Sequence, residues 1–248
     1  MKSNFLLIIV MLCSCLASAA VAADLPSPQE ALASLVDGNA RFVAGESAHP
    51  HLTIDRVLET GKDGQRPFAT IIGCSDSRVP IELVMDQGLG DLFIIRVAGN
   101  VCSTDEIGSI EYGVDHLNTP LMVVLGHTHC GACTAVATHA EVHGSIPALV
   151  APIGTAVAEV LDAQPGLEGD ALVEAVVEEN VWQSVESLLK RSPDTLRHIE
   201  EGSLMVVGAV YDIETGVVEW LGEHPQQSEI LMAMADGSTL AETATSRD

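Results

Sequence analysis

Basic residues are scarce in this chain, which has 11 Lys and Arg against 35 Asp and Glu and a formal net charge of −24. A polyanion of this kind repels phosphate backbones and anionic lipid headgroups. The composition therefore argues against a nucleic acid or an acidic membrane surface as a partner. It is typical instead of an acidic surface that keeps a protein in solution.

Internal repeats and long linkers are also missing. With 248 residues, 47% of them hydrophobic, the chain is long enough to bury one substantial core. We expect a single domain over residues 24–222. The polar tail over residues 223–248 is expected to be poorly ordered, and we assign it no function.

One apolar run stands apart at the N-terminus, over residues 5–12. The basic residue Lys2 precedes it, and small residues ending in Ala20-Val21-Ala22 follow it. This pattern predicts a secretory signal peptide over residues 1–23, cleaved near residues 22–23. The run is too short for a membrane span, so we expect no span and a mature protein in the periplasm or outside the cell.

Four of the six cysteines lie outside that segment. Cys74 and Cys130 have neighbours typical of metal ligands, and coordination would protect them from oxidation. Cys102 and Cys133 have no such neighbours, so we interpret them as small buried apolar side chains. A Cys102–Cys133 disulfide is the alternative in an oxidising compartment. Cys15 lies in a context that loosely resembles a lipoprotein cleavage box, which leaves lipidation as a further alternative.

Apolar runs and helical patterns alternate along the rest of the chain. Continuous apolar runs are typical of strands buried on both faces of a sheet, and they occupy residues 68–73, 92–97, 121–125 and 204–210. Residues 217–221 predict a short last strand. Helices are expected between these runs, over residues 28–45, 103–117, 131–142, 149–163 and 170–190.

Capping boxes support the first two of these helices, because Ser27 and Ser103 are each followed three residues later by a glutamate. The polar residues 46–65 between the first helix and the first strand predict an arm or a helix with a loop. Strands alternating with helices indicate an α/β fold. We expect a mostly parallel central sheet, with four parallel strands and a short antiparallel edge strand, flanked by helices and preceded by an N-terminal helical arm.

Two segments carry the candidate chemistry. Cys74-Ser75-Asp76-Ser77-Arg78 follows the first predicted strand, and Gly126-His127-Thr128-His129-Cys130-Gly131 follows the third. Sites in parallel sheets form at the carboxyl ends of strands, so both segments should meet at one edge. Two thiolates and an imidazole suit Zn²⁺, and three protein ligands leave a fourth position open for chemistry. A purely structural zinc site would normally close with a fourth Cys or His, so the choice between the two depends on what surrounds the ligands.

Together with residues 31–45, 86–91, 96–100 and 109–112, in this order, these segments make the chain after residue 23 resemble the β-class carbonic anhydrases. The resemblance implies reversible hydration of CO₂ to bicarbonate and a proton. It implies Zn²⁺ held by Cys74, His127 and Cys130, with Asp76 and Arg78 as a catalytic pair that orients the attacking zinc-bound hydroxide. It also implies a homodimer or a dimer of dimers, in which N-terminal helices cross onto the neighbouring subunit.

The ligand set itself makes the Asp–Arg pair important. Two thiolates neutralise the charge of the metal, so this zinc should be a weaker Lewis acid than zinc held by three imidazoles. Asp76 can orient the hydroxide, and Arg78 can hold the carboxylate off the metal. If the pair breaks, Asp76 could instead take the fourth zinc position, and both arrangements occur in the family. We predict the open arrangement, because Ile71 replaces the Trp of the family's regulatory bicarbonate pocket.

The resemblance also assigns three positions to substrate binding. Gln87 matches a substrate-bonding position near the zinc, although a polar turn residue is the alternative. Tyr112 matches a ring that lines the pocket of the partner subunit, with ordinary helix packing as an equal alternative. Gly131 belongs to the second motif. His129, between two ligands, is interpreted as an exposed loop residue rather than a proton shuttle.

Two other functions stay open at this point. The same zinc site could hydrolyse CS₂ or COS, which resemble CO₂, and access to the pocket would decide between these substrates. A non-catalytic protein that binds zinc or bicarbonate is the second alternative. The Asp76–Arg78 pair and the open fourth position count against it.

Overall fold

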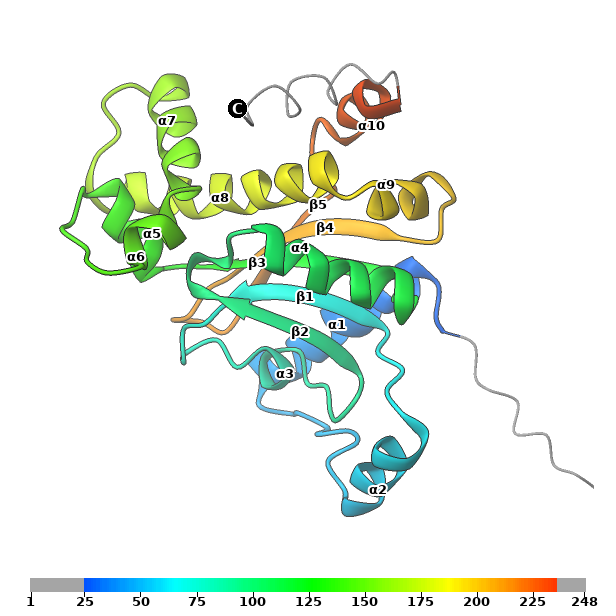
Figure 1. Cartoon of the computed structure of the whole chain (residues 1–248). Helices are drawn as coiled ribbons and strands as arrows, with labels where there is room; N and C mark the ends of the chain where they lie inside the picture. The colour runs from blue at the N-terminus through cyan, green and yellow to red at the C-terminus, as the bar shows by residue number, and fades with distance from the viewer. Residues whose placement is uncertain (1–24, 236–248) are drawn as a thin grey trace, which may run out of the picture.

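A computed structural model describes residues 25–235 (Figure 1). Within this part of the chain the strands form one five-stranded sheet in the order β2-β1-β3-β4-β5. The strands are β1 (Ala69–Cys74), β2 (Leu92–Val97), β3 (Leu121–His127), β4 (Met205–Tyr211) and β5 (Val218–Gly222). The first four run parallel and β5 is antiparallel to β4. The predicted fold class is therefore confirmed.

The central strands β1 and β3 are buried along their whole length, as their continuous apolar sequences require. Both extend slightly further than the apolar runs suggest. The ladder continues because Cys74 pairs with Val97 and His127 pairs with Tyr211. Two of the predicted metal ligands are thus the terminal residues of strands, rather than residues that follow them.

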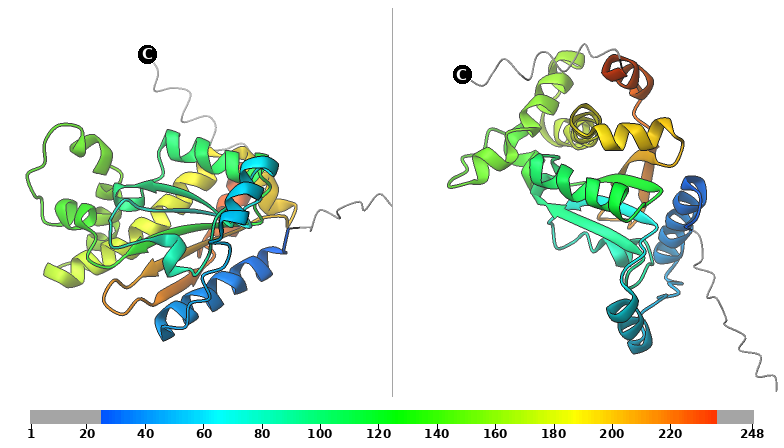
Figure 2. Two further views of the ribbon diagram at one scale, coloured as in Figure 1. Left: turned by 90° about the horizontal axis from the view of Figure 1, so that it is seen from below. Right: turned by 45° about the vertical axis from the view of Figure 1, so that its right-hand side comes forward.

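Helices cover both faces of the sheet (Figure 2). One face packs against α1 (Pro28–Ala44) and the short α3 (Ile81–Val84), and Leu35 of α1 is fully buried there. The other face packs against α4 (Thr104–Glu111), α8 (Gly169–Arg191) and α9 (Pro193–Glu200). This three-layer arrangement leaves the carboxyl ends of the parallel strands free to build a site.

The N-terminal helix α1 begins and ends as the sequence predicts. The hydroxyl of Ser27 accepts from the backbone N–H of Glu30, the Glu30 carboxylate accepts in return, and Gly45 closes the helix with a φ of 71°. Asn39, in the middle of α1, is buried. Its amide donates to the carbonyls of Val84 and Gly216 at 3.1 and 2.9 Å, and its oxygen accepts from Val218 N at 2.9 Å. One side chain therefore ties α1 to α3 and to the β4–β5 turn.

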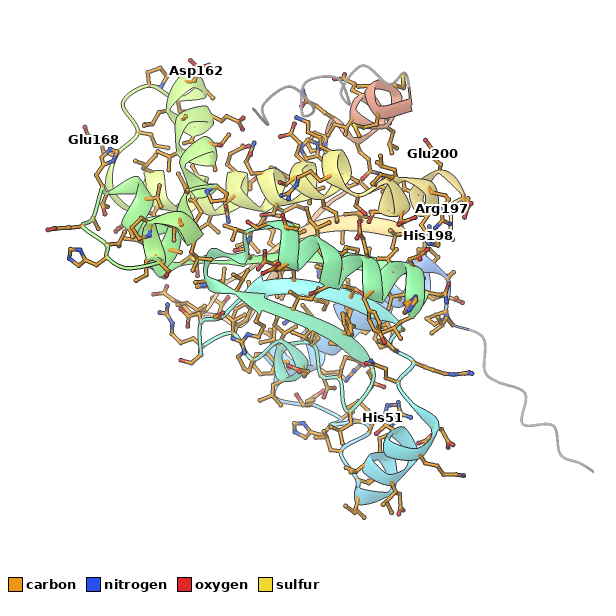
Figure 3. All side chains as sticks on the ribbon, in the orientation of Figure 1. His51, Asp162, Glu168, Arg197, His198 and Glu200 are labelled. Atoms are coloured by element: carbon orange, nitrogen blue, oxygen red, sulfur yellow. The ribbon has the colours of Figure 1, made fainter. Side chains whose placement is uncertain are left out.

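The arm predicted over residues 46–65 is a loop followed by α2 (Ile54–Asp63), which projects away from the sheet (Figure 1). The base of the arm is well anchored. Asp86 is buried and accepts from Arg41 and from the backbone of His49, while the His51 ring, labelled in Figure 3, lies 2.7 Å from the Asp91 carboxylate. The helix itself has no buried residue.

The remaining helices depart from the predicted boundaries. Proline breaks the helix expected over residues 149–163 into α6 (Ile146–Val150) and α7 (Ile153–Ala163), because Pro152 lies between them. The structure also contains η1 (Ala98–Asn100), a π-helical turn η2 (Tyr112–His116) that continues α4, and α5 (Gly131–Ala137). Residues expected to be poorly ordered form α10 (Gln227–Ala235), because its apolar side chain Ile230 is buried in the α8 face of the core.

Charged side chains link peripheral helices rather than forming a site. Arg197 and His198 of α9, labelled in Figure 3, reach the Asp115 carboxylate of η2 at 2.7 and 3.2 Å. Surface ion pairs of this kind contribute little each.

Cys74, Cys102, Cys130 and Cys133 are all free and buried. Cys102 and Cys133 belong to different clusters of the core, so the disulfide hypothesis is wrong and both are small buried side chains. The predicted signal peptide and Cys15 lie outside the described residues. Among residues 25–235 no helix is long and apolar enough to cross a membrane.

Candidate metal and catalytic centre

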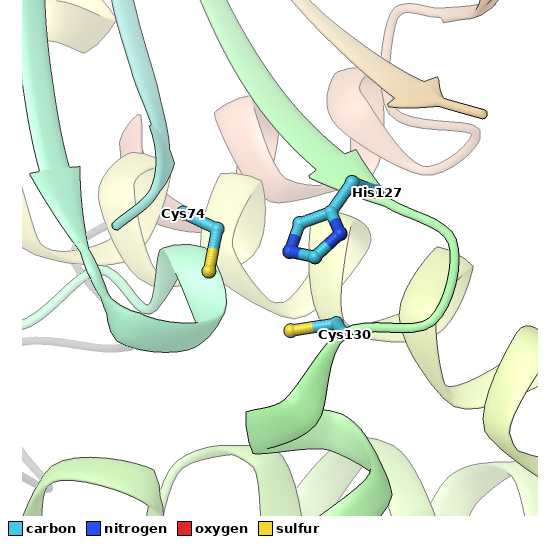
Figure 4. A group of neighbouring side chains, drawn as sticks. All are labelled: Cys74, His127 and Cys130. Atoms are coloured by element: carbon cyan, nitrogen blue, oxygen red, sulfur yellow. The ribbon is translucent and has the colours of Figure 1, made fainter. Parts of the chain in front are cut away.

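Three side chains from separate segments meet at the carboxyl edge of the sheet (Figure 4). Cys74 ends β1, His127 ends β3, and Cys130 is the N-cap residue of α5. One donor atom from each lies within 4.8 Å of the others, and all three residues are buried. The parallel pairing of β1 and β3 brings the two motifs together, as the sequence predicts.

The imidazole of His127 is oriented for a ligand. Its Nδ1 lies 2.9 Å from the Thr128 carbonyl, which can only accept, so Nδ1 carries the hydrogen and Nε2 has a free lone pair. That Nε2 is buried without any hydrogen-bond partner. A buried polar atom left unpaired needs an explanation, and a cation between the two sulfurs provides one.

The thiols give the same indication. The adjacent Cys130 and then burial raise the pKa of Cys74 to about 12, and the adjacent Cys133 raises the pKa of Cys130 to about 11. Two neighbouring buried sulfurs cannot both ionise unless a cation compensates them. Two sulfurs and one imidazole nitrogen are the donors that Zn²⁺ prefers, so these residues fit the metal that the family implies.

Asp76 and Arg78 lie beside this group as a bidentate pair. Arg78 Nε donates to Asp76 Oδ1 at 3.0 Å and its terminal nitrogen donates to Oδ2 at 2.7 Å. These bonds hold the pKa of the Asp76 carboxyl well below its usual range. Asp76 Oδ2 also lies 4.0 Å from His127 Nε2. The carboxylate is thus ionised, adjacent to the three donors, and held by the arginine.

A further arginine, to which the sequence interpretation gives no role, supports the first motif. Arg96 Nε donates to the Cys74 carbonyl at 3.0 Å, and another guanidinium nitrogen donates to the Asp76 carbonyl. Arg96 fixes the backbone turn that carries both the ligand and the carboxylate. Its signal in the sequence is a basic residue within the otherwise apolar run of residues 92–97, in a chain with 11 bases.

The second motif is fixed by Thr128. Its backbone N–H donates to the Tyr211 carbonyl at 2.9 Å, and its hydroxyl accepts from Ile213 N at 3.1 Å and donates to Asp212 Oδ1 at 3.4 Å. The β4–β5 turn therefore holds the loop between His127 and Cys130. Sequence reasoning could not find this link, because it joins segments more than 80 residues apart.

His129, in the same loop, is half-exposed and lies 3.6 Å from the Glu214 carboxylate. This agrees with its interpretation as an exposed loop residue. Its backbone carbonyl accepts from the Arg78 guanidinium at 3.1 Å, so the two motifs also contact one another directly.

The residues assigned to substrate binding are not brought together within one chain. The Gln87 amide turns back onto the Met85 carbonyl, 3.0 Å away. Tyr112 packs against Phe93, which pairs with Thr70 near the amino ends of the strands, opposite the metal ligands. Gly131 adjoins the centre, since it follows Cys130, and the space on its side-chain face is open.

The mostly parallel sheet, flanked by helices, carries a buried Cys–His–Cys group at its carboxyl edge, beside an ionised Asp–Arg pair. These features define an α/β protein with a candidate metal centre for catalysis. Comparison with known proteins narrows this class. The family model described as carbonic anhydrase matches residues 69–218.

Individual relatives agree. Carbonic anhydrase 2 of Mycobacterium tuberculosis is 41% identical over 196 residues, which cover 77% of this chain and 91% of the relative. The solved β-carbonic anhydrase CafA of Aspergillus fumigatus is 29% identical, with a TM-score of 0.67 over 83% of this chain and 97% of that one. A tetrameric β-carbonic anhydrase of Sordaria macrospora is 30% identical, with a TM-score of 0.60 over 78% and 98%. The chain therefore belongs to the carbonic anhydrase family and is an enzyme of its β class.

Proposed function

We propose that this enzyme hydrates CO₂ reversibly with Zn²⁺ held by Cys74, His127 and Cys130. The observation that carries the proposal is the unpartnered, buried Nε2 of His127 facing two buried thiols, beside an ionised carboxylate. Zinc bound there supplies a water of lowered pKa, and hence a nucleophile near neutral pH.

The residues of the chain supply orientation. Asp76 accepts a hydrogen bond from the attacking oxygen, which fixes the direction of its lone pair towards CO₂. Arg78 occupies both carboxylate oxygens of Asp76 and is itself held by the His129 carbonyl. These bonds keep the carboxylate ionised and would hold it off a metal bound by the three donors, which corresponds to the open arrangement. Burial of the three donors keeps these side chains out of contact with bulk solvent.

We also propose that the working unit contains at least two copies of the chain. Tyr112 lies near the amino ends of the strands, opposite the metal centre of its own chain, and α2 with its preceding loop exposes apolar side chains that a second copy could cover. The exposed fractions of Leu52, Ile54 and Leu58 are 53, 69 and 65%. The related enzyme of Sordaria macrospora is tetrameric, which supports a dimer or a dimer of dimers here.

Export is a further part of the proposal. The basic start, short apolar centre and Ala20-Val21-Ala22 site of residues 1–23 support a cleaved signal peptide. The enzyme would then convert CO₂ and bicarbonate in the periplasm or outside the cell. N-terminal sequencing of the mature protein tests this, and a mature protein that retains Met1 in the cytosol contradicts it.

Stopped-flow CO₂ hydration by the purified zinc protein tests the activity. We expect Cys74→Ser to lose nearly all activity, and Ser203→Ala, a control that removes an exposed hydroxyl bonded to His198, to keep it. CS₂ or COS turnover without CO₂ hydration would indicate the alternative hydrolase. Stoichiometric zinc with no rate above the Cys74→Ser variant would indicate a non-catalytic zinc protein.

A further inference from the structure

Helix α8 carries a polar stripe within its buried face. Asn180 and Ser184 are 1 and 3% exposed, yet their neighbours on that face are valines and leucines. Arg191 lies seven residues beyond Ser184, so the three side chains follow one side of the helix. Burying an amide or a hydroxyl is unfavourable unless each finds a hydrogen-bond partner. The partners of this stripe therefore identify its role.

All three side chains bond to one segment, residues 98–102, which we name the strap. Asn180 donates to the Gly99 carbonyl at 2.8 Å, Ser184 to the Asn100 carbonyl at 2.9 Å, and Arg191 to the Cys102 carbonyl at 3.3 Å. The strap follows the last residue of β2, so the sheet ladder no longer holds it. Hydrogen bonds from the polar stripe of α8 hold the strap in place of the hydrogen bonds of the sheet.

The strap is also fixed by its own backbone and packing. Gly99 has a φ of 75°, which favours glycine, and a Cβ there would lie 2.8 Å from Ile153 Cδ1 and 2.9 Å from Ala132 Cβ. No larger residue fits without a shift of α5 or α7. Gly99 is therefore held in one conformation between Asn180 and the metal centre.

The other polar group of Gly99 reaches a predicted metal ligand. Its N–H donates to Cys74 Sγ at 3.3 Å. Hydrogen bonds to a metal-bound thiolate withdraw charge from the sulfur and fix its direction. In a centre with two thiolates, this withdrawal offsets part of the charge that weakens the Lewis acidity of the metal.

We propose that Asn180, supported by Ser184, is a positioning residue of the metal centre, because it holds the strap so that the Gly99 N–H points at Cys74 Sγ. The inference rests on the proposed metal site but not on the identity of the substrate. Asn180 does not touch the reacting atoms and acts only through Gly99.

The test uses Asn180→Leu, which keeps the approximate volume and removes the amide, and Asn180→Gln, which retains an amide. Gln183→Leu is the matched control. It removes a side-chain amide from the same helix, but this amide donates to the Glu159 carboxylate and not to the strap. Each full-length variant is loaded with Co²⁺, and the sulfur-to-cobalt charge-transfer band is recorded. Zn²⁺ affinity is measured by chelator competition.

In Asn180→Leu we expect the band to move to lower energy, because the sulfur becomes more electron-rich. Zn²⁺ affinity and kcat should each fall by about tenfold with little change in KM. Gln183→Leu should match the parent, and Asn180→Gln should recover part of the loss. If Asn180→Leu does not fold, Ser184→Ala serves as the milder variant, with a smaller shift in the same direction.

A folded variant with an unchanged band and unchanged Zn²⁺ affinity overturns the proposal, whichever of the two variants is used. The proposed function fails separately: if the parent protein shows no CO₂ hydration while Asn180→Leu still shifts the band, the positioning role stands and the reaction assignment does not.

Discussion

The metal centre and the α2 arm differ in how far one chain completes them. The three donors of the centre are buried and oriented by contacts from the same chain, through Arg78, Arg96 and Gly99. The α2 helix has no buried residue and presents apolar side chains to solvent. One copy of the chain thus builds the reactive group, whereas the apolar side chains of α2 stay exposed in a single copy.

The free energy of burying apolar side chains supports this difference between the metal centre and α2. A helix of 10 residues is marginal in water by itself, so its stability must come from packing. Burying one large aliphatic side chain contributes about 1.5–3 kcal/mol, and α2 with its preceding loop exposes four such side chains, at Leu52, Ile54, Val57 and Leu58. A second copy that covers them would stabilise both the arm and the assembly.

The largest expected effect concerns metal binding by the self-contained centre. The pKa values of Cys74 and Cys130 are raised to about 12 and about 11, so both thiols are protonated between pH 6 and 8 until a cation displaces the protons. Zn²⁺ binding should release about two protons, and affinity should rise about hundredfold per pH unit. Chelator competition at several pH values measures the slope. A slope below tenfold per unit would contradict the thiol pair as ligands.

The next effect is that of the Asp–Arg pair. Arg78→Gln frees the Asp76 carboxylate to turn towards the metal, and we expect kcat to fall by about hundredfold. The pKa of Asp76, depressed by Arg78, should return upwards, so the variant should lose further activity as the pH falls towards 4. Stopped-flow pH profiles check both changes. Arg66→Gln, an exposed arginine of equal charge, should behave as the parent, and a similar loss there would point to net charge instead.

The arm should show a smaller effect that depends on protein concentration. Leu58→Glu places a charge on the apolar face of α2, and we expect the dimer to dissociate at least about tenfold more readily. Lys62→Gln, which changes the net charge by the same amount on the same helix, is the control. Sedimentation velocity gives the assembly, and the Zn²⁺ affinity of the dissociated chain should equal that of the parent. Loss of zinc on dissociation would show that the two regions are not independent.

Thr128→Val should have the smallest effect. It removes the hydroxyl that bonds the β4–β5 turn while it keeps the shape of the side chain, so the loop between two ligands loosens. We expect kcat to fall by about threefold with near-normal folding, and Thr128→Ser to restore the rate. Equal rates in all three proteins would show that backbone bonds alone hold the loop.

The sequence predicted best what depends on local pattern. Continuous apolar runs located the strands, and the ends of β1 and β3 located Cys74 and His127, because parallel strands share an edge. The predictions that failed concern contacts between residues far apart in the sequence. The Cys102–Cys133 disulfide hypothesis was wrong, because spacing does not reveal that the two thiols occupy different clusters.

Other misses have the same origin. The roles of Arg96, Asn180 and Gly99 depend on contacts between residues 22 to 81 positions apart, which no local pattern reports. The helix expected over residues 149–163 is two helices, because one proline interrupts it. The sequence contains this proline, but the hydrophobic periodicity on both sides of it indicated one continuous helix. Packing against α8 ordered α10 in a segment whose composition alone indicated a tail.

Asn39 has a consequence for the order in which the chain folds. Its contacts reach Gly216 and Val218, 177 and 179 residues further along, so α1 leaves the ribosome long before its partners exist. Closing so long a loop is slow, and synthesis proceeds at only about 5–20 residues per second. The hydrogen bonds from Asn39 to Gly216 and Val218 can therefore form only after the β4–β5 hairpin has been synthesised. Until then the N-terminal part of the nascent chain remains open to whatever machinery handles it.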